Sequence, residues 1–351
     1  MRILNVINVR WFNATAWYAV SLSSALCAKG HDVAVLGLPG TPPVLKAQGV
    51  GLETFEADIN KSNPFSFIAN LGAMDKLFMS FEPDVVICHR GEFYPYFAYR
   101  RITKQKFRLY RVRGDIRPPK PGRLNRAFHN KCTDAIITSG QFIKQQYMDI
   151  LGTPEAGINV IHCGVDTSVF KPLSFSRIKI RDEFNIKEED FLVGIVGRFD
   201  PIKGHENLIK AVSKLYSNGI KNIKLMIAGF DAVSSSSDIE KMINDNGIKD
   251  ITIMTGKRED IADIYNALDV CVVSSLGSEA ICRVGMEAMA CGVPLITSDT
   301  GVLPEISKNI YPKDDWEALA ELIVNHDKST KVYSLEDFTE QVETIISKKN
   351  D

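Results

Sequence analysis

Short apolar runs alternate along the chain with segments in which apolar residues recur every three or four positions. The runs predict buried parallel strands, and the segments between them predict helices. In the first half of the chain the expected strands are residues 3–9, 32–38, 84–88, 108–112, 135–138 and 159–162. In the second half they are residues 191–196, 224–228, 251–254, 270–274 and 294–297. Strands that alternate with helices in this way predict an α/β protein with doubly wound parallel sheets.

The helix patterns and the length of the chain predict two domains. The clearest helix covers residues 206–217, whose apolar residues share one stripe before Gly219 ends the pattern. The other helices on which the interpretation depends are residues 283–290 and 335–347. The serine cluster 234–237 predicts a loop. A chain of 351 residues is longer than one typical hydrophobic core, so we expect a domain boundary near residue 168.

Composition describes an ordinary globular protein. Hydrophobic residues make up 45% of the chain and the formal net charge is −1, which excludes a disordered chain or one that coats nucleic acid. No run approaches the roughly 18 apolar residues of a membrane-spanning helix, and the N-terminus begins with a strand pattern, so we expect no signal peptide and a cytoplasmic location. The seven cysteines form no C-x-x-C pair and lie mostly in apolar runs, which predicts reduced, buried thiols without disulfides or a zinc site.

Two carboxylates lie close to one predicted helix N-terminus in segment 274–305. Glu279 belongs to the loop after a buried strand, which begins with the Ser/Gly-rich residues 274–278, and Glu287 lies one turn inside helix 283–290. In an open α/β sheet this edge binds ligands, and helix N-termini there favour phosphate. We expect Glu287 to accept hydrogen bonds from ribose hydroxyls and Glu279 from a transferred sugar. The alternative, a solvated helix face, fits Glu287 poorly because its helix is mostly apolar.

Segment 274–305 resembles the donor-site signature of retaining glycosyltransferases of family 4, in which Glu279 and Glu287 match the E-x7-E pair. GRFDPIKG at 197–204 resembles the diphosphate-binding segment of that family, with Arg198 and Lys203 at the matching basic positions. GVDTSVFKP at 164–172 resembles the family's interdomain junction, and TGVLPEI at 300–306 resembles its segment after the sheet. These motifs occur in the family's order and spacing.

The resemblance implies the GT-B architecture, in which two Rossmann-like, doubly wound domains face a cleft. Residues 1–168 would then bind the acceptor and residues 169–334 the nucleotide-sugar, and residues 335–351 would return to the first domain. It also implies that Arg198, Lys203 and backbone N–H groups stabilise the departing diphosphate while the configuration of the sugar is retained. The residues implied in donor binding through those N–H groups or near the base are Ala280, Ile281, Cys282 and Arg283, and Gly256, Lys257 and Arg258. No D-x-D motif occurs in a loop expected to contact the donor, so we expect no catalytic metal and no cofactor.

The first domain departs from the family pattern. The turn after its first strand lacks the usual glycines, so the side chains of Asn13 and Thr15 are expected to take over part of the phosphate binding. Where many relatives carry a histidine near the scissile bond, this chain has Arg113. Asp115 is a second residue for the acceptor side, or a structural partner of Arg113 or Arg117. His89, at the end of strand 84–88, is either a catalytic residue in the cleft or a satisfied strand-end histidine.

The stretch 100–131 predicts a strongly basic surface. It holds twelve Lys or Arg residues and one acidic residue, and aromatic residues lie in or near it. Such a surface suits an anionic membrane, a nucleic acid or solvent alone, and no nucleic-acid motif accompanies it. Because the first domain of a GT-B enzyme binds the acceptor, we expect a lipid-linked or phosphorylated saccharide acceptor and no nucleic acid.

The sequence therefore predicts a retaining glycosyltransferase that moves a sugar from a nucleotide-sugar donor to a saccharide or lipid-linked saccharide. Resemblance is closest to members that assemble lipopolysaccharide or cell-surface polysaccharide. A GT-B-like sugar-nucleotide epimerase is the first alternative, but His89 and Asp115 are its only candidate acid-base groups. An NAD-dependent oxidoreductase would need a G-x-G-x-x-G turn, which neither domain provides. A noncatalytic sugar-nucleotide binder stays open.

Overall fold

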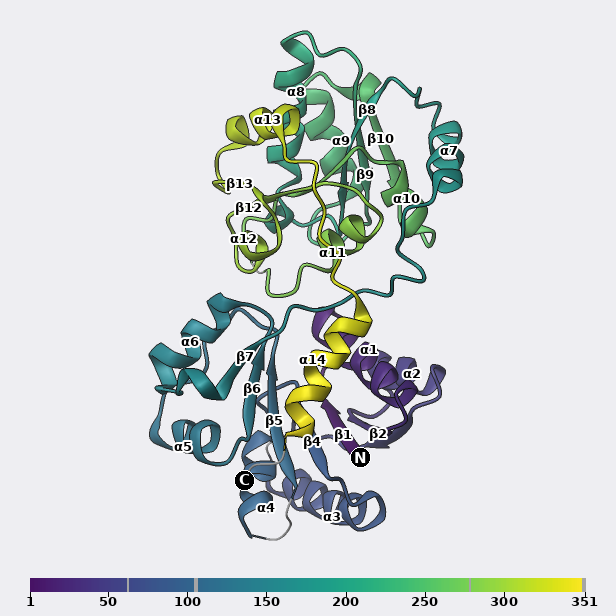
Figure 1. Cartoon of the computed structure of the whole chain (residues 1–351). Helices are drawn as coiled ribbons and strands as arrows, with labels where there is room; N and C mark the ends of the chain where they lie inside the picture. Colours follow the sequence, from purple (N-terminus) through teal and green to yellow (C-terminus); the bar gives the residue numbers. More distant parts are fainter. Residues whose placement is uncertain (62, 104–106, 278, 349–351) are drawn as a thin grey trace. The chain divides into compact units, whose positions relative to one another are not determined.

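The computed structural model describes residues 1–61, 63–103, 107–277 and 279–348. They form two compact units (Figure 1). Unit 1 consists of Met1–Gly164 together with the segment that begins at Leu335, and unit 2 consists of Val165–Ser334. The division falls a few residues before the expected boundary at 168. Unit 2 is therefore inserted between two parts of the chain that make up unit 1.

Unit 1 is built on a parallel sheet with the strand order β3-β2-β1-β4-β5-β6-β7 over the described residues. The strands are β1 (Arg2–Ile7), β2 (Asp32–Gly37), β3 (Glu53–Glu56), β4 (Val85–Cys88), β5 (Arg108–Arg113), β6 (Ala135–Thr138) and β7 (Ile158–Val160). The order changes direction between β1 and β4, so the carboxyl ends of these two strands mark the switch point where ligands bind in such sheets.

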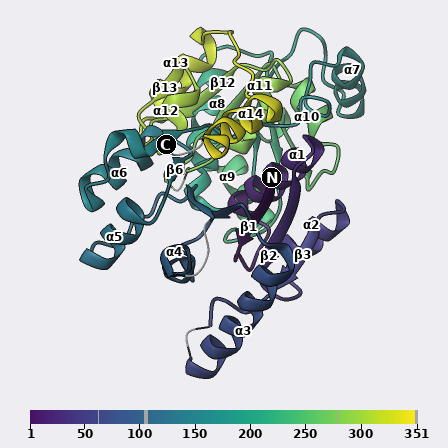
Figure 2. The ribbon, with the colours of Figure 1, turned by 60° about the horizontal axis from the view of Figure 1, so that its bottom comes forward.

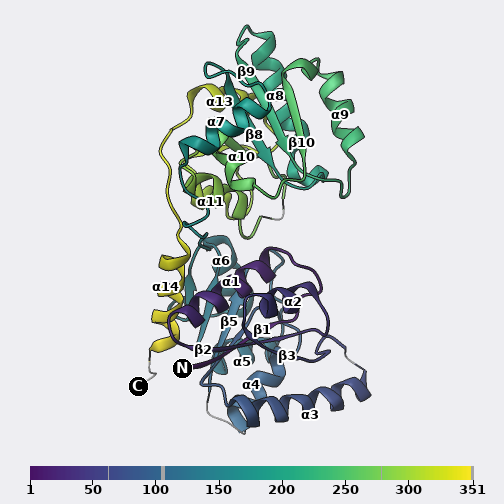
Figure 3. The same cartoon turned by 90° about the vertical axis from the view of Figure 1, so that its right-hand side faces the viewer.

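Helices cover both faces of this sheet. They are α1 (Ala14–Ala28), α2 (Pro42–Gly49), α3 (Pro64–Phe81), α4 (Tyr94–Thr103), α5 (Arg123–Lys131), α6 (Gln141–Leu151) and α14 (Leu335–Ser347). On one face, Leu4 and Val86 pack with Phe78 of α3 and Phe97 of α4. On the other, α14 lies beside α1, as Figures 1 and 3 show. The ring of Phe338 lies 4.8 Å from that of Tyr18 between them, which fixes α14 to unit 1.

Unit 2 repeats this architecture with the strand order β10-β9-β8-β11-β12-β13 over the described residues. The strands are β8 (Phe191–Val196), β9 (Ile223–Ala228), β10 (Thr252–Gly256), β11 (Val270–Val273), β12 (Leu295–Ser298) and β13 (Asn309–Tyr311). The helices are α7 (Ser174–Glu183), α8 (His205–Ser217), α9 (Ser236–Asp245), α10 (Ile261–Ala267), α11 (Arg283–Ala290), α12 (Leu303–Ile306) and α13 (Trp316–Asn325). The switch point lies between β8 and β11.

Both faces of the unit 2 sheet are buried. Val193 and Ile195 of β8 belong to a core with Leu208 of α8. The intervening Gly194 faces the opposite side, where the side chain of Leu268 covers it. On that side α7 packs against α10, as Figure 2 shows. Burial on both faces explains why the strands are continuous apolar runs in the sequence.

The two sheets confirm the predicted fold class of two doubly wound α/β domains, and every expected strand overlaps an observed one. Two short strands, β3 and β13, were not expected. The predicted loop at 234–237 is wrong in its second half, because α9 begins at Ser236. Ser235 caps this helix and Asp238 returns the hydrogen bond, which forms a capping box. The serine cluster thus marks a helix start.

Candidate functional site

An ion pair connects the two loops that flank the switch point of unit 2. Lys203, after β8, donates through Nζ to Oε1 of Glu279, after β11. Ser275 Oγ donates to the same oxygen at 2.6 Å. The side chain of Glu279 is 7% exposed and that of Lys203 is 30% exposed. Within the described part of the chain, Oε2 of Glu279 makes no hydrogen bond, so the carboxylate keeps acceptor capacity for a ligand hydroxyl.

Close backbone contacts hold these loops in place. Gly204 has φ +68°, and a Cβ there would lie 1.9 Å from the carbonyl oxygen of Ser274. Gly301, with φ +58°, comes equally close to the carbonyl oxygen of Glu279, which also accepts from Val302 N at 2.9 Å. Only glycine combines such approaches with a left-handed backbone. The loops after β8, β11 and β12 therefore form one rigid edge around Glu279.

Arg198 lies on the same edge with its guanidinium half exposed. It donates to Oδ2 of Asp200 at 2.8 Å, and its side chain is 53% exposed. Asp200 Oδ1 accepts from Ile202 N at 3.1 Å and so caps the 3₁₀ turn Pro201–Lys203. Burial alone would raise the pKa of Asp200, but the hydrogen bonds from Ile202 and Arg198 outweigh it and lower the pKa. Asp200 thus holds the arginine and the turn of Lys203 together.

Glu287 lies in α11, whose observed bounds are the predicted 283–290. It is 4% exposed; Oε2 accepts from the Tyr265 hydroxyl at 3.0 Å and Oε1 pairs with Arg283 Nε at 3.0 Å. Burial raises the pKa of Glu287 above its ordinary value, while Arg283 and Tyr265 oppose the rise. Each oxygen can accept a second hydrogen bond, and contact with a ribose stays a prediction. Nothing in the apolar sequence of α10 indicated Tyr265.

The three residues expected near the nucleotide base, 256–258, make different contacts within unit 2. Gly256 ends β10, and Lys257 pairs with the exposed Glu259 at 3.0 Å. Arg258 binds Glu183 of α7 at 2.6 Å and Asp260, before α10, at 2.8 Å. Arg258 therefore holds α7 and α10 together, which is a structural role that its place in the motif did not indicate.

The backbone at the start of α11 is partly satisfied within the unit. Arg283 N donates to Ile281 O at 3.1 Å, and Cys282, the N-cap, accepts from Met286 N at 3.1 Å. Ile281 and Cys282 are buried and Ala280 is half-buried. An N–H at Arg283 would have to leave its internal partner to bind phosphate. Residue 278, in the predicted loop 274–278, lies outside the described residues.

In unit 1 His89 lies at the switch point, directly after β4. It is 3% exposed, and its Nε2 lies 3.0 Å from Asn5 Oδ1 of β1. Burial lowers the pKa of His89 to about 3, and the nearby Arg111 lowers it as well, so the ring is neutral near pH 7. Its Nδ1 has no hydrogen-bond partner among the described residues. His89 is thus a buried, incompletely satisfied histidine.

The remaining first-domain residues hold local structure. Asn13 caps α1 by accepting from Ala16 N at 3.1 Å, and Thr15 Oγ1 lies 3.5 Å from Gly114 O. Asp115 pairs with Arg117 Nε at 3.0 and 3.1 Å, which is one of the structural contacts expected for it. Arg113 donates to the backbone oxygen of Arg117. Roles of these residues toward donor or acceptor stay predictions.

Over the part of the chain that the structure describes, no group of three His, Cys, Asp or Glu side chains lies close enough to hold a metal ion. The expectation of a reaction without metal or cofactor stays a prediction. All seven cysteines are free. The expectation of buried thiols is correct except at Cys27, which is exposed. No helix found in the described ranges is long and apolar enough to cross a membrane.

Two family models match the chain. Residues 176–329 match the model of glycosyl transferases group 1, and residues 15–169 match that of glycosyltransferase family 4. A D-inositol 3-phosphate glycosyltransferase of Mycobacteroides abscessus is 29% identical over 205 residues, which are 54% of this chain and 44% of the relative. The match therefore spans less than half of that relative's length.

Solved structures share the fold. A structure of Anabaena Alr3699/HepE in complex with UDP has a TM-score of 0.84 at 17% identity and covers 99% of this chain and 100% of that chain. Another, with UDP-glucose, has a TM-score of 0.72 at 18% identity, with coverages of 98% and 96%. WaaG, a glycosyltransferase involved in lipopolysaccharide biosynthesis, has a TM-score of 0.64 at 18% identity, with coverages of 99% and 100%. With both domains matched by their models, the chain belongs to the glycosyltransferases of family 4 and has the GT-B fold.

Proposed function

We propose that this protein transfers a sugar from a nucleoside diphosphate sugar to a saccharide or lipid-linked saccharide, in the assembly of a cell-surface polysaccharide or lipopolysaccharide. The observation that carries the proposal is the Lys203–Glu279 pair at the switch point of unit 2, with Arg198 on the same edge. Family membership supports it, as do the UDP and UDP-glucose bound by Alr3699/HepE. The buried, neutral His89 offers no support to the epimerase alternative.

In this proposal the cations of the edge exchange partners when donor binds. Lys203 and Arg198 are each paired with one carboxylate and are each partly exposed. A diphosphate offers more negative charge than one carboxylate, and it suits both the ammonium and the planar guanidinium. Glu279, released from Lys203, accepts hydrogen bonds from the donor sugar, and Glu287 accepts them from the ribose. The edge therefore binds both charged and neutral parts of the donor.

The proposed reaction retains the configuration of the sugar. The bond between C1 and the diphosphate oxygen breaks, and the bond from C1 to the acceptor oxygen forms on the same face. The acceptor hydroxyl proton passes to the departing phosphate. Lys203 and Arg198 stabilise the charge that grows on that phosphate, so we propose a reaction that needs no metal or cofactor.

Unit 1 is the proposed acceptor unit. Arg100 and Arg111 of the basic stretch 100–131 are buried, so the expected basic surface is reduced to the exposed cations Arg117, Lys120, Arg123, Arg126 and Lys131 within the described residues. These would bring the enzyme to an anionic membrane surface from the cytoplasmic side, where a lipid-linked acceptor is presented. Liposome cosedimentation tests this contact. Binding that does not depend on anionic lipid would contradict it.

A thermal-shift screen tests the donor assignment first. UDP, GDP, ADP, CMP and their sugar conjugates are compared, with NAD as control. A ligand at 100 times its dissociation constant adds about 2.7 kcal/mol to folded-state stability, or several degrees in Tm. One nucleoside diphosphate should stabilise the protein selectively. No shift with any nucleotide would contradict the proposal, and a shift without any transfer of the sugar would favour a noncatalytic binder.

The Glu287→Ala variant tests the ribose contact. We expect its donor affinity, measured by calorimetry, to fall about tenfold or more, because a buried carboxylate that accepts a ligand hydrogen bond is lost. Circular dichroism establishes that the variant is folded. Donor binding equal to that of the wild type would show that Glu287 holds only Tyr265 and Arg283.

A further inference from the structure

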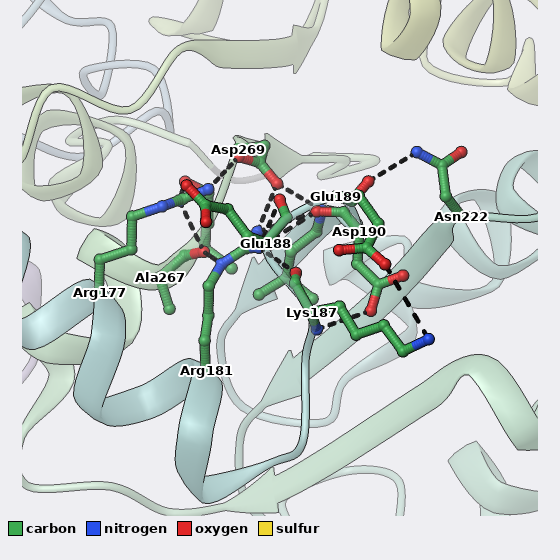
Figure 4. Close-up of polar contacts among 11 residues, drawn as sticks. Arg177, Arg181, Lys187, Glu188, Glu189, Asp190, Asn222, Ala267 and Asp269 are labelled. Atoms are coloured by element: carbon green, nitrogen blue, oxygen red, sulfur yellow. Dashed lines mark hydrogen bonds and ion pairs between the residues drawn. The ribbon is translucent and has the colours of Figure 1, made fainter.

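Three arginines are buried among the described residues, namely Arg100, Arg111 and Arg181, and two of them are paired with a carboxylate. Arg181 of α7 is 5% exposed and donates to Asp269 Oδ2 at 2.7 Å, with further hydrogen bonds to backbone oxygens of the 187–190 turn (Figure 4). Arg111 of β5 is 1% exposed and donates through Nη1 to the backbone oxygens of Cys88 and Val112, each at 2.7 Å. Among the described residues no carboxylate pairs with Arg111, and its Nε has no partner.

A buried cation without a counterion is unfavourable unless an anion reaches it. Arg111 lines a cavity of about 340 Å³ at the carboxyl edge of the unit 1 sheet, together with residues of α4, α5, α6 and the loop after β5. Cavities that bind small molecules have volumes of about 300–1,000 Å³. The unpaired guanidinium therefore faces a space that is large enough for a ligand.

The other charges around this cavity leave it positive. Five cationic side chains line it, against the acidic Glu92 and Asp115. Each of these acids is bound to an arginine of the cavity, Glu92 to Arg90 and Asp115 to Arg117. The cations not neutralised in this way, within the described ranges, are Arg111, Arg113 and Lys120.

Arg113 reinforces the charge at the cavity. Its Nε is buried without a partner among the described residues, and Nη2 donates only to the backbone oxygen of Arg117. Burial lowers the pKa of Arg113, and the neighbouring Arg111 lowers it further, because the two positive charges disfavour one another. A bound anion would relieve this repulsion and satisfy the free N–H groups.

We propose that this cavity binds a phosphate monoester, held by Arg111 and Arg113 with Lys120 at its mouth. Guanidinium groups form bidentate, charge-assisted hydrogen bonds with phosphate oxygens, and a dianion offers oxygens to several cations at once. Resting on the proposed function, the monoester is a group of the acceptor, either on a soluble saccharide or on a lipid. The acceptor is thus recognised by its phosphate as well as by its sugar.

Calorimetry with inorganic phosphate tests the site without any turnover. The full chain carries Arg198→Gln and Lys203→Gln, so that phosphate cannot bind at the proposed donor diphosphate site. We expect one phosphate per chain, and a loss of affinity of about tenfold or more when Arg113→Gln is added, since a charge-assisted hydrogen bond is lost. Arg123→Gln is the matched control: it removes the same charge from the same basic stretch, and Arg123 is exposed and outside the cavity.

Arg111→Met, tested in the same background, should abolish phosphate binding. If that variant does not fold by circular dichroism, Arg113→Gln decides the question. Equal phosphate affinities for Arg113→Gln and Arg123→Gln would overturn the proposal, because the affinity would then depend only on the net charge of the surface. Absence of phosphate binding in the background chain would overturn it as well.

Competition distinguishes the two sources of the phosphate. Glucose 6-phosphate represents a soluble monoester, and phosphatidylcholine vesicles containing phosphatidic acid represent a lipid one. We expect the competitor that resembles the natural ligand to displace phosphate from the background chain but not to bind the Arg113→Gln variant. If neither competes, the monoester assignment is wrong. If no nucleotide stabilises the protein, phosphate binding in the unit 1 cavity is unaffected, because it is measured without a donor. If the enzyme transfers sugar to neutral acceptors but binds no phosphate, the proposed function holds and the proposed phosphate site is wrong.

Discussion

At the carboxyl edge of the unit 2 sheet, cations are matched by carboxylates: Lys203 pairs with Glu279 and Arg198 with Asp200. At the corresponding edge of unit 1, the described residues give Arg111 two carbonyl oxygens and the face of the Tyr94 ring but no carboxylate, and the adjacent His89 is neutral. At the unit 2 edge an anion would compete with carboxylates that already neutralise the cations. The unit 1 edge already has cationic N–H groups that need one.

The comparison extends to the opposite edge of unit 2. There Arg181 is also buried, but Asp269, the residue before β11, pairs with it (Figure 4). Asp269 also accepts from the backbone N of Leu192 in β8 at 2.6 Å. Such a network stabilises a fold and leaves no capacity for a ligand. Burial of an arginine alone therefore does not indicate a site; the absence of a carboxylate beside it does.

The sharpest test of this difference removes Arg181 and Arg111 in turn. Arg181→Met breaks the buried ion pair with Asp269, which keeps only the more exposed Arg177 as a partner, and should lower the free energy of unfolding by about 3–5 kcal/mol. Arg111→Met leaves no carboxylate unpaired and should cost only about 1–3 kcal/mol for its two carbonyl hydrogen bonds. Urea unfolding followed by hydrogen exchange with mass spectrometry measures each unit separately. A larger loss for Arg111→Met would show that the comparison is wrong.

Removal of the cation at the unit 2 edge should act on turnover. Lys203→Ala is expected to reduce kcat by about 10²–10³, equivalent to roughly 2.7–4 kcal/mol of transition-state stabilisation, because charge on the departing phosphate loses a partner. Sugar-transfer kinetics measure the effect. The matched control is Lys241→Ala, which breaks an exposed pair with Asp245 inside α9. Equal kinetics for the two variants would contradict the assigned role of Lys203.

The rigidity of the unit 2 edge is tested at Gly204. An alanine there meets both a left-handed backbone and the carbonyl oxygen of Ser274 at 1.9 Å. Gly247 has almost the same φ, +67°, with open space around its Cβ position. Gly247→Ala should cost about 1–2 kcal/mol and Gly204→Ala measurably more in thermal unfolding. Equal losses would mean that the loops around Glu279 adjust freely.

Acid should weaken unit 1 more steeply than unit 2. Burial is the main cause that lowers the pKa of His89 to about 3, and of His129 and His205 to about 4. Unfolded histidine titrates near pH 6.5, so between about pH 5 and 6.5 the unfolded chain binds more protons and stability falls as pH falls. Unit 1 holds two of these histidines and unit 2 one.

Within unit 2 the raised pKa of Glu287 acts in the opposite direction, because the folded state keeps a proton above pH 4.5 and loses stability as pH rises through its folded pKa. Each proton contributes about 1.4 kcal/mol per pH unit. Unit-resolved hydrogen exchange at several pH values measures the two slopes, and His89→Gln should reduce that of unit 1. Equal slopes in the two units would contradict the expected difference.

Sequence patterns predicted the parts of this molecule that local chemistry determines. Buried strands appear as apolar runs because helices cover both sheet faces, and the observed bounds of α11 and α14 are the predicted ones. The unexpected strands β3 and β13 are short, and the polar sequence ETFE of β3 carries no apolar run. A strand at the edge of a sheet is only partly buried, so its sequence need not be a continuous apolar run.

The sequence predicted which residues lie at the candidate site but not which side chains they contact. The positions of Glu279 and Glu287 follow from the motif and the predicted helix, but their partners Ser275 and Tyr265 depend on how the loops and α10 pack. The sequence indicated Arg111 only as one of the twelve basic residues in stretch 100–131. That it is buried, and that no carboxylate of the described chain reaches it, depends on tertiary structure alone.

The placement of α14 has a consequence for synthesis of the protein. Phe338, Val342 and Ile346 of this helix are buried in unit 1, yet the whole of unit 2 separates them from Gly164 in the chain. At the usual rate of about 5–20 residues per second, the ribosome completes this helix on the order of 10–40 s after the rest of unit 1. During that interval unit 2 can fold first, while the nascent unit 1 presents the uncovered side of α1 to chaperones.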